Sequence, residues 1–289
     1  VEPLEKKNVL LEMEIPDTGE YVLTLSFVLR EDTLWAKRGH EIAYGQEVIG
    51  KMEAREPSKK PYTVTKGWHN IGVKGEDFEV LFSILHGGLV SYRYGGVEML
   101  KAIPKPNFWR ALTDNDVANL LPFRAGQWKV ASMFSTFKYN HGRAATDCTL
   151  EEAEDHITVT YTYHLPVRPQ MDCEVAYSVY GDGEVKVKMT MDPSAEVGEL
   201  PEYSMLFIMD ADYDHLSWYG LGPEETYVDK CHAKLGLYHN KVADNMAKYL
   251  VPQECGNKTG VRYAKVTDEH GRGLLIQGDQ LHFSALPYS

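Results

Sequence analysis

The sequence has little positive charge for its length. Its 289 residues include 30 Lys and Arg against 42 Asp and Glu, which gives a formal net charge of −12. Binding to nucleic acid or anionic lipid requires concentrated Lys and Arg, and no basic stripe occurs along the chain. Apolar runs near twenty residues are also absent. The sequence therefore predicts no nucleic-acid partner and no membrane partner.

Metal-binding and disulfide patterns are scarce as well. The four cysteines have no CxxC spacing, and the 11 histidines form no HxH or HExxH grouping. A zinc site or a disulfide framework normally leaves such spacings in the sequence. We therefore expect buried free thiols, no metal site and no cofactor in this chain.

Helical periodicity is rare, whereas period-two alternation of apolar and polar residues is common. Alternating runs occupy residues 21–29, 157–163 and 185–191, and Gly-rich or Asp-rich turns separate them from their neighbours. The best helix candidate is short, from about Gly126 to Phe134. This pattern predicts an all-β protein.

A polar segment with two prolines, residues 51–61, has the composition of a linker. The fifty residues before it can form only a few strands, whereas a complete sandwich needs about seven. More than 200 residues follow it, enough for one large two-sheet sandwich. We expect two parts, residues 1–60 with an incomplete sandwich and residues 61–289 with the large one.

Both ends of the chain indicate a longer natural polypeptide. The first residue is Val1 rather than a methionine, and residues 281–289 are typical of a strand followed by a turn. We expect that the large sandwich continues beyond the last residue.

Five blocks in the chain resemble, in the same order, the C-terminal half of the β-galactosidases of glycoside hydrolase family two. Asn107–Asp116 reads NFWRALTDND, close to the family's NFWRAPTDND. The other blocks are WAKRGHEIA at Trp35–Ala43, WYGLGPEETYVD at Trp218–Asp229, PQECGN at Pro252–Asn257 and FSA at Phe283–Ala285. One such block alone would carry little weight, but the ordered set is specific.

The resemblance implies a fold and a reaction. It implies that residues 1–60 are part of an immunoglobulin-like domain and that residues 61–289 are a truncated antiparallel supersandwich, similar to galactose mutarotase. The family hydrolyses terminal β-D-galactosides with retention, through two glutamates on a TIM barrel. Nothing in this sequence alternates strands and helices as a barrel would. The resemblance thus implies a portion without catalytic residues, whose partners are the barrel of the same polypeptide and, through it, a galactoside. Mg and Na would bind at that missing domain.

Asp114, Asn115 and Asp116 are candidates for the substrate-facing part of the chain. They could form an Asx-type turn, support a substrate loop that begins near Val117, or bind a cation through carboxylate and carbonyl oxygens. The resemblance implies the substrate loop. Two carboxylates this close on one segment cannot flank a sugar as a glycosidase pair does.

Three further residues complete the candidate set. Trp109 could present its ring to a sugar or pack in the core, and Arg110 could form an ion pair with Asp114 or Asp116. Glu254 is the best single carboxylate for a carbohydrate or cation site, by analogy with mutarotase-like folds. The alternative for Glu254 is a structural ion pair with Arg262.

Two other functions remain open. A carbohydrate-binding module would need exposed aromatic rings along a groove, and an aldose mutarotase would need a His–Glu pair in the sandwich cleft. Unpaired strand edges would favour self-association, so a homo-oligomer is also open. The sequence indicates neither the specific galactoside nor the compartment.

Overall fold

The computed structural model describes residues 4–53, 55–137 and 148–287. The chain divides into two compact units, residues 1–56 with 234–236 and residues 57–233 with 237–289. Antiparallel sheets dominate both units and the helices are short, so the all-β prediction is confirmed. The more detailed assignment to an immunoglobulin-like fragment and a supersandwich stays a prediction.

The first unit contains one long hairpin. Strands β1 (Gly19–Val28) and β2 (Glu41–Lys51) pair in antiparallel register, from Gly19 opposite Lys51 to Phe27 opposite Ala43. The alternation predicted for this segment gives a strand, but Leu25 and Phe27 are exposed. A two-stranded ribbon has too little area to bury its apolar side chains, which explains their exposure.

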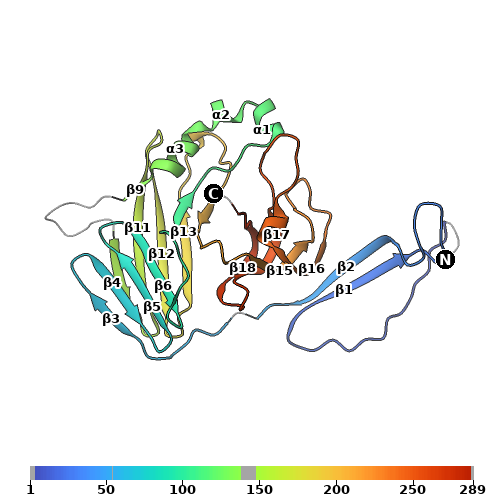
Figure 1. Cartoon of the computed structure of the whole chain (residues 1–289), viewed down its shortest axis with the longest axis horizontal. Helices are drawn as coiled ribbons and strands as arrows, with labels where there is room; N and C mark the ends of the chain where they lie inside the picture. Colours follow the sequence, from blue (N-terminus) through green and yellow to red (C-terminus); the bar gives the residue numbers. More distant parts are fainter. Residues whose placement is uncertain (1–3, 54, 138–147, 288–289) are drawn as a thin grey trace. The chain divides into compact units, whose positions relative to one another are not determined.

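Two five-stranded sheets contribute most of the core of the second unit (Figure 1). The strands of one sheet lie in chain order: β3 (Thr63–Lys66), β4 (Asn70–Lys74), β5 (Phe78–Ser83), β6 (Gly88–Tyr94) and β7 (Val97–Glu98). The other contains β9 (Thr136–Phe137), β10 (Cys148–Glu152), β11 (His156–Leu165), β12 (Met171–Tyr180) and β13 (Val185–Met191).

Alternation in the sequence sets which side chains these strands bury. In β11 every second residue is buried, from Ile157 to Leu165, while the residues between them are half-buried. Strand β12 repeats the pattern, and its turn to β13 lies at Gly181–Gly183. The strands predicted at residues 157–163 and 185–191 are therefore confirmed, together with the turn before the second.

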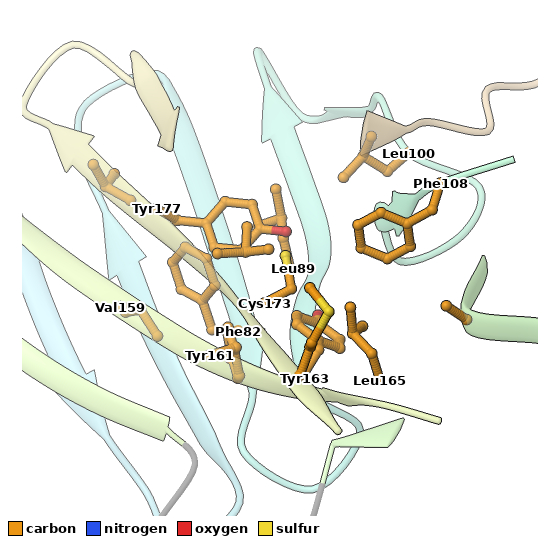
Figure 2. Packing of buried hydrophobic residues seen from close by; sticks show 14 of the residues in the cluster. Phe82, Leu89, Leu100, Phe108, Val159, Tyr161, Tyr163, Leu165, Cys173 and Tyr177 are labelled. Atoms are coloured by element: carbon orange, nitrogen blue, oxygen red, sulfur yellow. The ribbon is translucent and has the colours of Figure 1, made fainter. Parts of the chain in front are cut away.

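Aromatic side chains fill this core (Figure 2). The Phe82 ring lies 5.6 Å from the Tyr177 ring, and neither is measurably exposed. Tyr161 and Tyr163 donate their hydroxyl hydrogens to the carbonyls of Ser83 (3.1 Å) and Gly87 (2.7 Å). Most buried hydroxyls have such partners, and these two bonds connect β11 to the end of β5 and the turn before β6. The buried hydroxyl of Tyr177 has no partner among the described residues.

A third sheet has a smaller core of its own around Leu216, Trp218 and Val261. Its strand order is β16 (Lys234–Lys241), β15 (His215–Gly222), β17 (Lys258–Thr267) and β18 (Gly273–Phe283). A turn at residues 268–271 separates β17 from β18. In this turn the Asp268 carboxylate accepts hydrogen bonds from the backbone of His270 and Arg272.

Three short helices lie between strands β8 (Lys105–Asn107) and β9: α1 (Asp114–Ala118), α2 (Leu121–Arg124) and α3 (Gly126–Phe134). Helix α3 is confirmed with the predicted bounds. Thr113 caps α1 and Pro122 opens α2, so two short helices occupy this segment. The substrate loop expected to begin near Val117 stays a prediction. Strand β14 (Ser204–Leu206) pairs with β8. Within the described residues, no helix is long and apolar enough to span a membrane.

The described structure contains no disulfide among its four cysteines. Cys173 and Cys255 are buried, as expected for structural thiols, but Cys231 is exposed. The prediction of buried thiols is therefore wrong for Cys231.

Replacing Phe82 with Ala should lower the free energy of unfolding by about 3–5 kcal/mol, because the cavity lies where two sheets meet. Phe123→Ala is the matched control. Phe123 is 85% exposed, so its loss should change stability by less than about 0.5 kcal/mol. Urea unfolding monitored by circular dichroism measures both, and equal effects would contradict the assigned core.

Candidate functional site

The segment with the two aspartates begins a helix. The Thr113 hydroxyl accepts a hydrogen bond from the Asp116 backbone (3.2 Å), and the Asp116 carboxylate accepts one from the Thr113 backbone (2.9 Å). This reciprocal capping box fixes the first turn of α1. The expected Asx-type turn is therefore wrong in form, although Asp116 does bond to nearby backbone.

Arg110 forms the predicted ion pair with Asp116. The guanidinium Nη1 lies 2.5 Å from one carboxylate oxygen and Nη2 lies 3.3 Å from the other. Burial raises the pKa of Asp116, but hydrogen bonds from Arg110 and Thr113 more than offset this, so the pKa lies below its ordinary value. Asp116 is ionised at neutral pH and anchors Arg110.

Gln253 connects this segment to the Pro252–Asn257 block, 139 positions away. Its carboxamide oxygen accepts a hydrogen bond from the Asp114 backbone (3.2 Å), and its nitrogen donates to the Asp114 carboxylate (3.3 Å). One side chain thereby satisfies both a free helix N–H and a helix carboxylate. Two of the five blocks that carry the family resemblance, Asn107–Asp116 and Pro252–Asn257, are therefore neighbours in space.

Glu254 follows Gln253 in the loop and lies close enough to Arg110 for the two side chains to interact electrostatically. Burial raises the pKa of its carboxyl to about 7, with a further contribution from Glu202, while Arg110 and the backbone N–H of Ala111 lower it. A carboxyl of this kind is both hydrogen-bond donor and acceptor near neutral pH. Arg262, the alternative partner, donates to the Gly260 carbonyl (2.8 Å) and covers the Tyr219 ring.

A buried carboxylate holds the loop that carries Glu254. Glu225 accepts hydrogen bonds from the backbone of Gly256 (2.9 Å), from Lys230 (3.0 Å) and from the Tyr249 hydroxyl. Burial raises the pKa of Glu225, but these three donors lower it below its ordinary value. Gly256 has φ +79°, and a Cβ there would lie 2.8 Å from the Asn245 carbonyl oxygen. Only glycine fits without displacement of the backbone.

Hydrogen bonds join the end of the Pro252–Asn257 loop to the Trp218–Asp229 block. The Thr226 N–H donates to the Asn257 carbonyl (2.8 Å), and the Asn257 side chain donates to the Thr226 carbonyl (2.9 Å). The Thr226 hydroxyl accepts from the Thr259 backbone (2.8 Å). Lys258 is buried, with its ammonium 3.2 Å from the Pro223 carbonyl and 4.9 Å from the Trp218 ring centre. Burial lowers the pKa of Lys258, although Glu224 and Glu225 act against this.

The predicted residues thus fall into two groups. Arg110, Asp114, Asp116 and Glu254 gather around the contact between α1 and the Pro252–Asn257 loop. Trp109 is half-buried against the sandwich core, and Asn115 is exposed on α1. We define the first group, with Gln253 and Glu202, as the α1–loop cluster.

Sequence reasoning missed several members of this arrangement. Gln253 and Glu225 lie inside the blocks that carry the resemblance, so the blocks themselves were the available signal. Glu202 and Tyr249 belong to no motif, and only the fold brings them here.

Two surface hollows lie away from the α1–loop cluster. One, of about 570 Å³, is on the sheet β3–β7 and is lined by Lys74, Glu79, Arg93 and Glu98 among others, with no aromatic ring in its lining. A smaller one, of about 120 Å³, includes His86 and Tyr163. The described residues include no group of three or more His, Cys, Asp and Glu placed to hold a metal ion.

Comparison with known families agrees with this block structure. Residues 74–289 match the family described as "Beta galactosidase small chain", and residues 1–50 match "Beta-galactosidase, domain 4". The chain belongs to the β-galactosidase small-chain family. All five blocks quoted from the sequence lie within these two matched ranges.

Several curated relatives of this small-chain family member are named β-galactosidase. One from Priestia megaterium is 40% identical over 94% of this chain, and one from Halalkalibacterium halodurans is 39% identical over 92%. The chain spans about a quarter of each, 26% of their length. A relative from Latilactobacillus sakei, named β-galactosidase small subunit, is 33% identical over 69% of this chain and is covered over 66% of its own length.

Replacing Glu254 with Gln should remove a pH dependence of stability. An unfolded glutamate loses its proton near pH 4.5, whereas folded Glu254 keeps it to about pH 7. Stability conferred by the protonated form therefore falls as the pH rises from about 4.5 to 7 and stays constant above that. At pH 8 Glu254→Gln should raise the free energy of unfolding by about 1–3 kcal/mol, and at pH 4.5 by much less.

Urea unfolding at pH 5, 6, 7 and 8 measures this difference. Glu151→Gln, at an exposed position on β10, is the matched control and should follow the wild-type pH dependence. A constant difference between Glu254→Gln and wild type across the range would contradict the protonated carboxyl.

Proposed function

We propose that this chain is a non-catalytic portion of a β-galactosidase that hydrolyses terminal β-D-galactosides with retention. In that enzyme the chain supports and partly walls the active site. The family match over residues 74–289 carries the proposal, together with relatives that are named β-galactosidase and are about four times as long.

The contacts of the acidic residues support a non-catalytic role. Retaining hydrolysis uses two carboxyl groups about 5–5.5 Å apart, on opposite sides of the scissile bond. Asp116 is bound to Arg110 and the Thr113 backbone, and Asp114 is bound to Gln253. These aspartates fix the local structure. The catalytic glutamates, and the Mg and Na of the family, then belong to a barrel domain of the same polypeptide.

The α1–loop cluster supplies the supporting function. Arg110 is held by Asp116, and Gln253 bonds to Asp114, so the segment around α1 and the Pro252–Asn257 loop keep a fixed relative position. Trp109, Asn115 and Glu254 are the side chains that face carbohydrate in the complete enzyme. A Glu254 carboxyl with a pKa of about 7 can donate to one sugar hydroxyl oxygen or accept from a hydroxyl group.

The purified chain alone should not hydrolyse an aryl β-galactoside, because the proposal assigns the catalytic carboxyl pair to the barrel domain. Release of o-nitrophenol should equal the buffer blank, while the β-galactosidase from Halalkalibacterium halodurans gives full turnover under the same conditions. Turnover that copurifies with the chain through two orthogonal columns would contradict the non-catalytic role.

A chimera tests the supporting role. When this chain replaces the matching segment of the Halalkalibacterium halodurans enzyme, aryl galactoside hydrolysis should be retained. Arg110→Ala in the chimera should lower kcat/KM about 10- to 100-fold, because a small displacement of a supporting wall has that effect. Arg93→Ala removes an ion pair between Arg93 on β6 and Glu98 on β7. It is the control and should leave kcat/KM unchanged. An inactive chimera with a native melting profile would count against the proposed function.

A further inference from the structure

Helix α3 is apolar on two opposite sides. Trp128 and Ala131 are buried against the sandwich, while Val130, Met133 and Phe134 point away from them at helical spacing and are exposed. A surface helix normally has one apolar side, and a helix that is apolar all round is normally buried. We therefore expect the outer side of α3, with Val130, Met133 and Phe134, to be covered by a partner.

The neighbouring helices continue the same kind of surface. Phe123 of α2 is 85% exposed, and Val117 of α1 is also exposed. Leu120 is held at φ +57°, a conformation that non-glycine residues seldom adopt, with its side chain exposed. Residues with strained backbone conformations cluster at functional sites, where the strain positions a side chain.

These residues belong to one continuous stretch of chain. Figure 1 shows α1, α2 and α3 next to one another at one end of the sandwich strands, and α2 contacts both of the others. We define the apolar helix surface by six exposed side chains: Val117, Leu120, Phe123, Val130, Met133 and Phe134.

The charge on this stretch is unusual for the protein. Between residues 117 and 134 the only charged residues are Arg124 and Lys129, both basic, in a chain with net charge −12. Arg124 is already paired with Glu199, so Lys129 is the basic charge that a two-fold contact between two copies would bring toward its own equivalent, which is unfavourable. A partner with an apolar patch and acidic groups at its rim fits better.

The comparisons indicate which partner that is. The curated relatives contain about three-quarters of their length outside the segment that this chain matches. One relative that matches 69% of this chain is named as a small subunit, so a similar region occurs as a separate polypeptide. A β-galactosidase portion that exists as a separate polypeptide needs a surface that binds the rest of the enzyme.

We propose that the apolar helix surface is the docking site for the remainder of the β-galactosidase polypeptide. This inference rests on the proposed function and adds the surface by which the portion joins its enzyme. Phe123 and Phe134 are its aromatic anchors, because large rings that become buried contribute most at such interfaces.

Association in trans tests the surface. This chain is mixed with a Halalkalibacterium halodurans β-galactosidase from which the matching segment has been deleted, and the dissociation constant is measured by biolayer interferometry. The wild-type chain should bind, and the double variant Phe123→Glu, Phe134→Glu should bind about 30-fold more weakly or worse. Trp68→Glu is the control, since Trp68 is 92% exposed on the β3–β4 turn, and it should bind like wild type.

Each outcome has a definite meaning. Absence of wild-type binding, or a double variant that binds as tightly as wild type, would overturn the docking site. Light scattering that shows a dimer of the chain alone, lost in the double variant, would identify a second copy as the occupant and also overturn it.

The activity of the covalent chimera reports on the proposed function separately. An active chimera with unaffected trans binding by the double variant would reject this surface alone. Exposed positions should leave the melting temperature unchanged, which confirms that the variants fold.

Discussion

The arrangement of the α1–loop cluster depends on one buried carboxylate, Glu225. It accepts hydrogen bonds from the Gly256 backbone, the Lys230 ammonium and the Tyr249 hydroxyl, and each of these comes from a different part of the chain. An unpaired buried carboxylate is strongly unfavourable, so all three donors are drawn to fixed positions. Because Gly256 is one of them, the loop that carries Gln253 and Glu254 is fixed as well.

From that loop the constraint passes to α1. Gln253 bonds to Asp114 through both backbone and side chain, and Asp116 holds Arg110 two residues beyond Phe108, whose ring is fully buried in the sandwich core. One connection between the Pro252–Asn257 loop and the sandwich core therefore runs through polar contacts at α1.

Much of the fold could be predicted from the sequence, because strands and turns are local. The alternation at residues 157–163 and 185–191 and the helix at Gly126–Phe134 depend on neighbours only a few positions away. The α1–loop cluster was harder to predict from the sequence, because it depends on residues far apart along the chain. The pKa of Glu254 depends on Glu202, 52 positions earlier and outside any motif. Helix α1 was missed because five residues give no periodicity, and only the Thr113 capping box explains it.

The sequence also does not indicate which apolar residues of a short helix are buried. In a single sequence, Trp128 and Phe134 are both large aromatics within one short helix, and nothing in their spacing says which of them belongs to the core. The fold makes the distinction, since Trp128 packs near the Phe108 ring while Phe134 stays exposed. Single exposed apolar side chains are common on folded proteins, but a contiguous exposed apolar patch indicates an interaction surface. Within residues 117–134 such a patch is concentrated on three adjoining helices next to the Asn107–Asp116 block. The same short region therefore has two tasks: its inner side closes the sandwich core, and its outer side keeps an apolar surface in place.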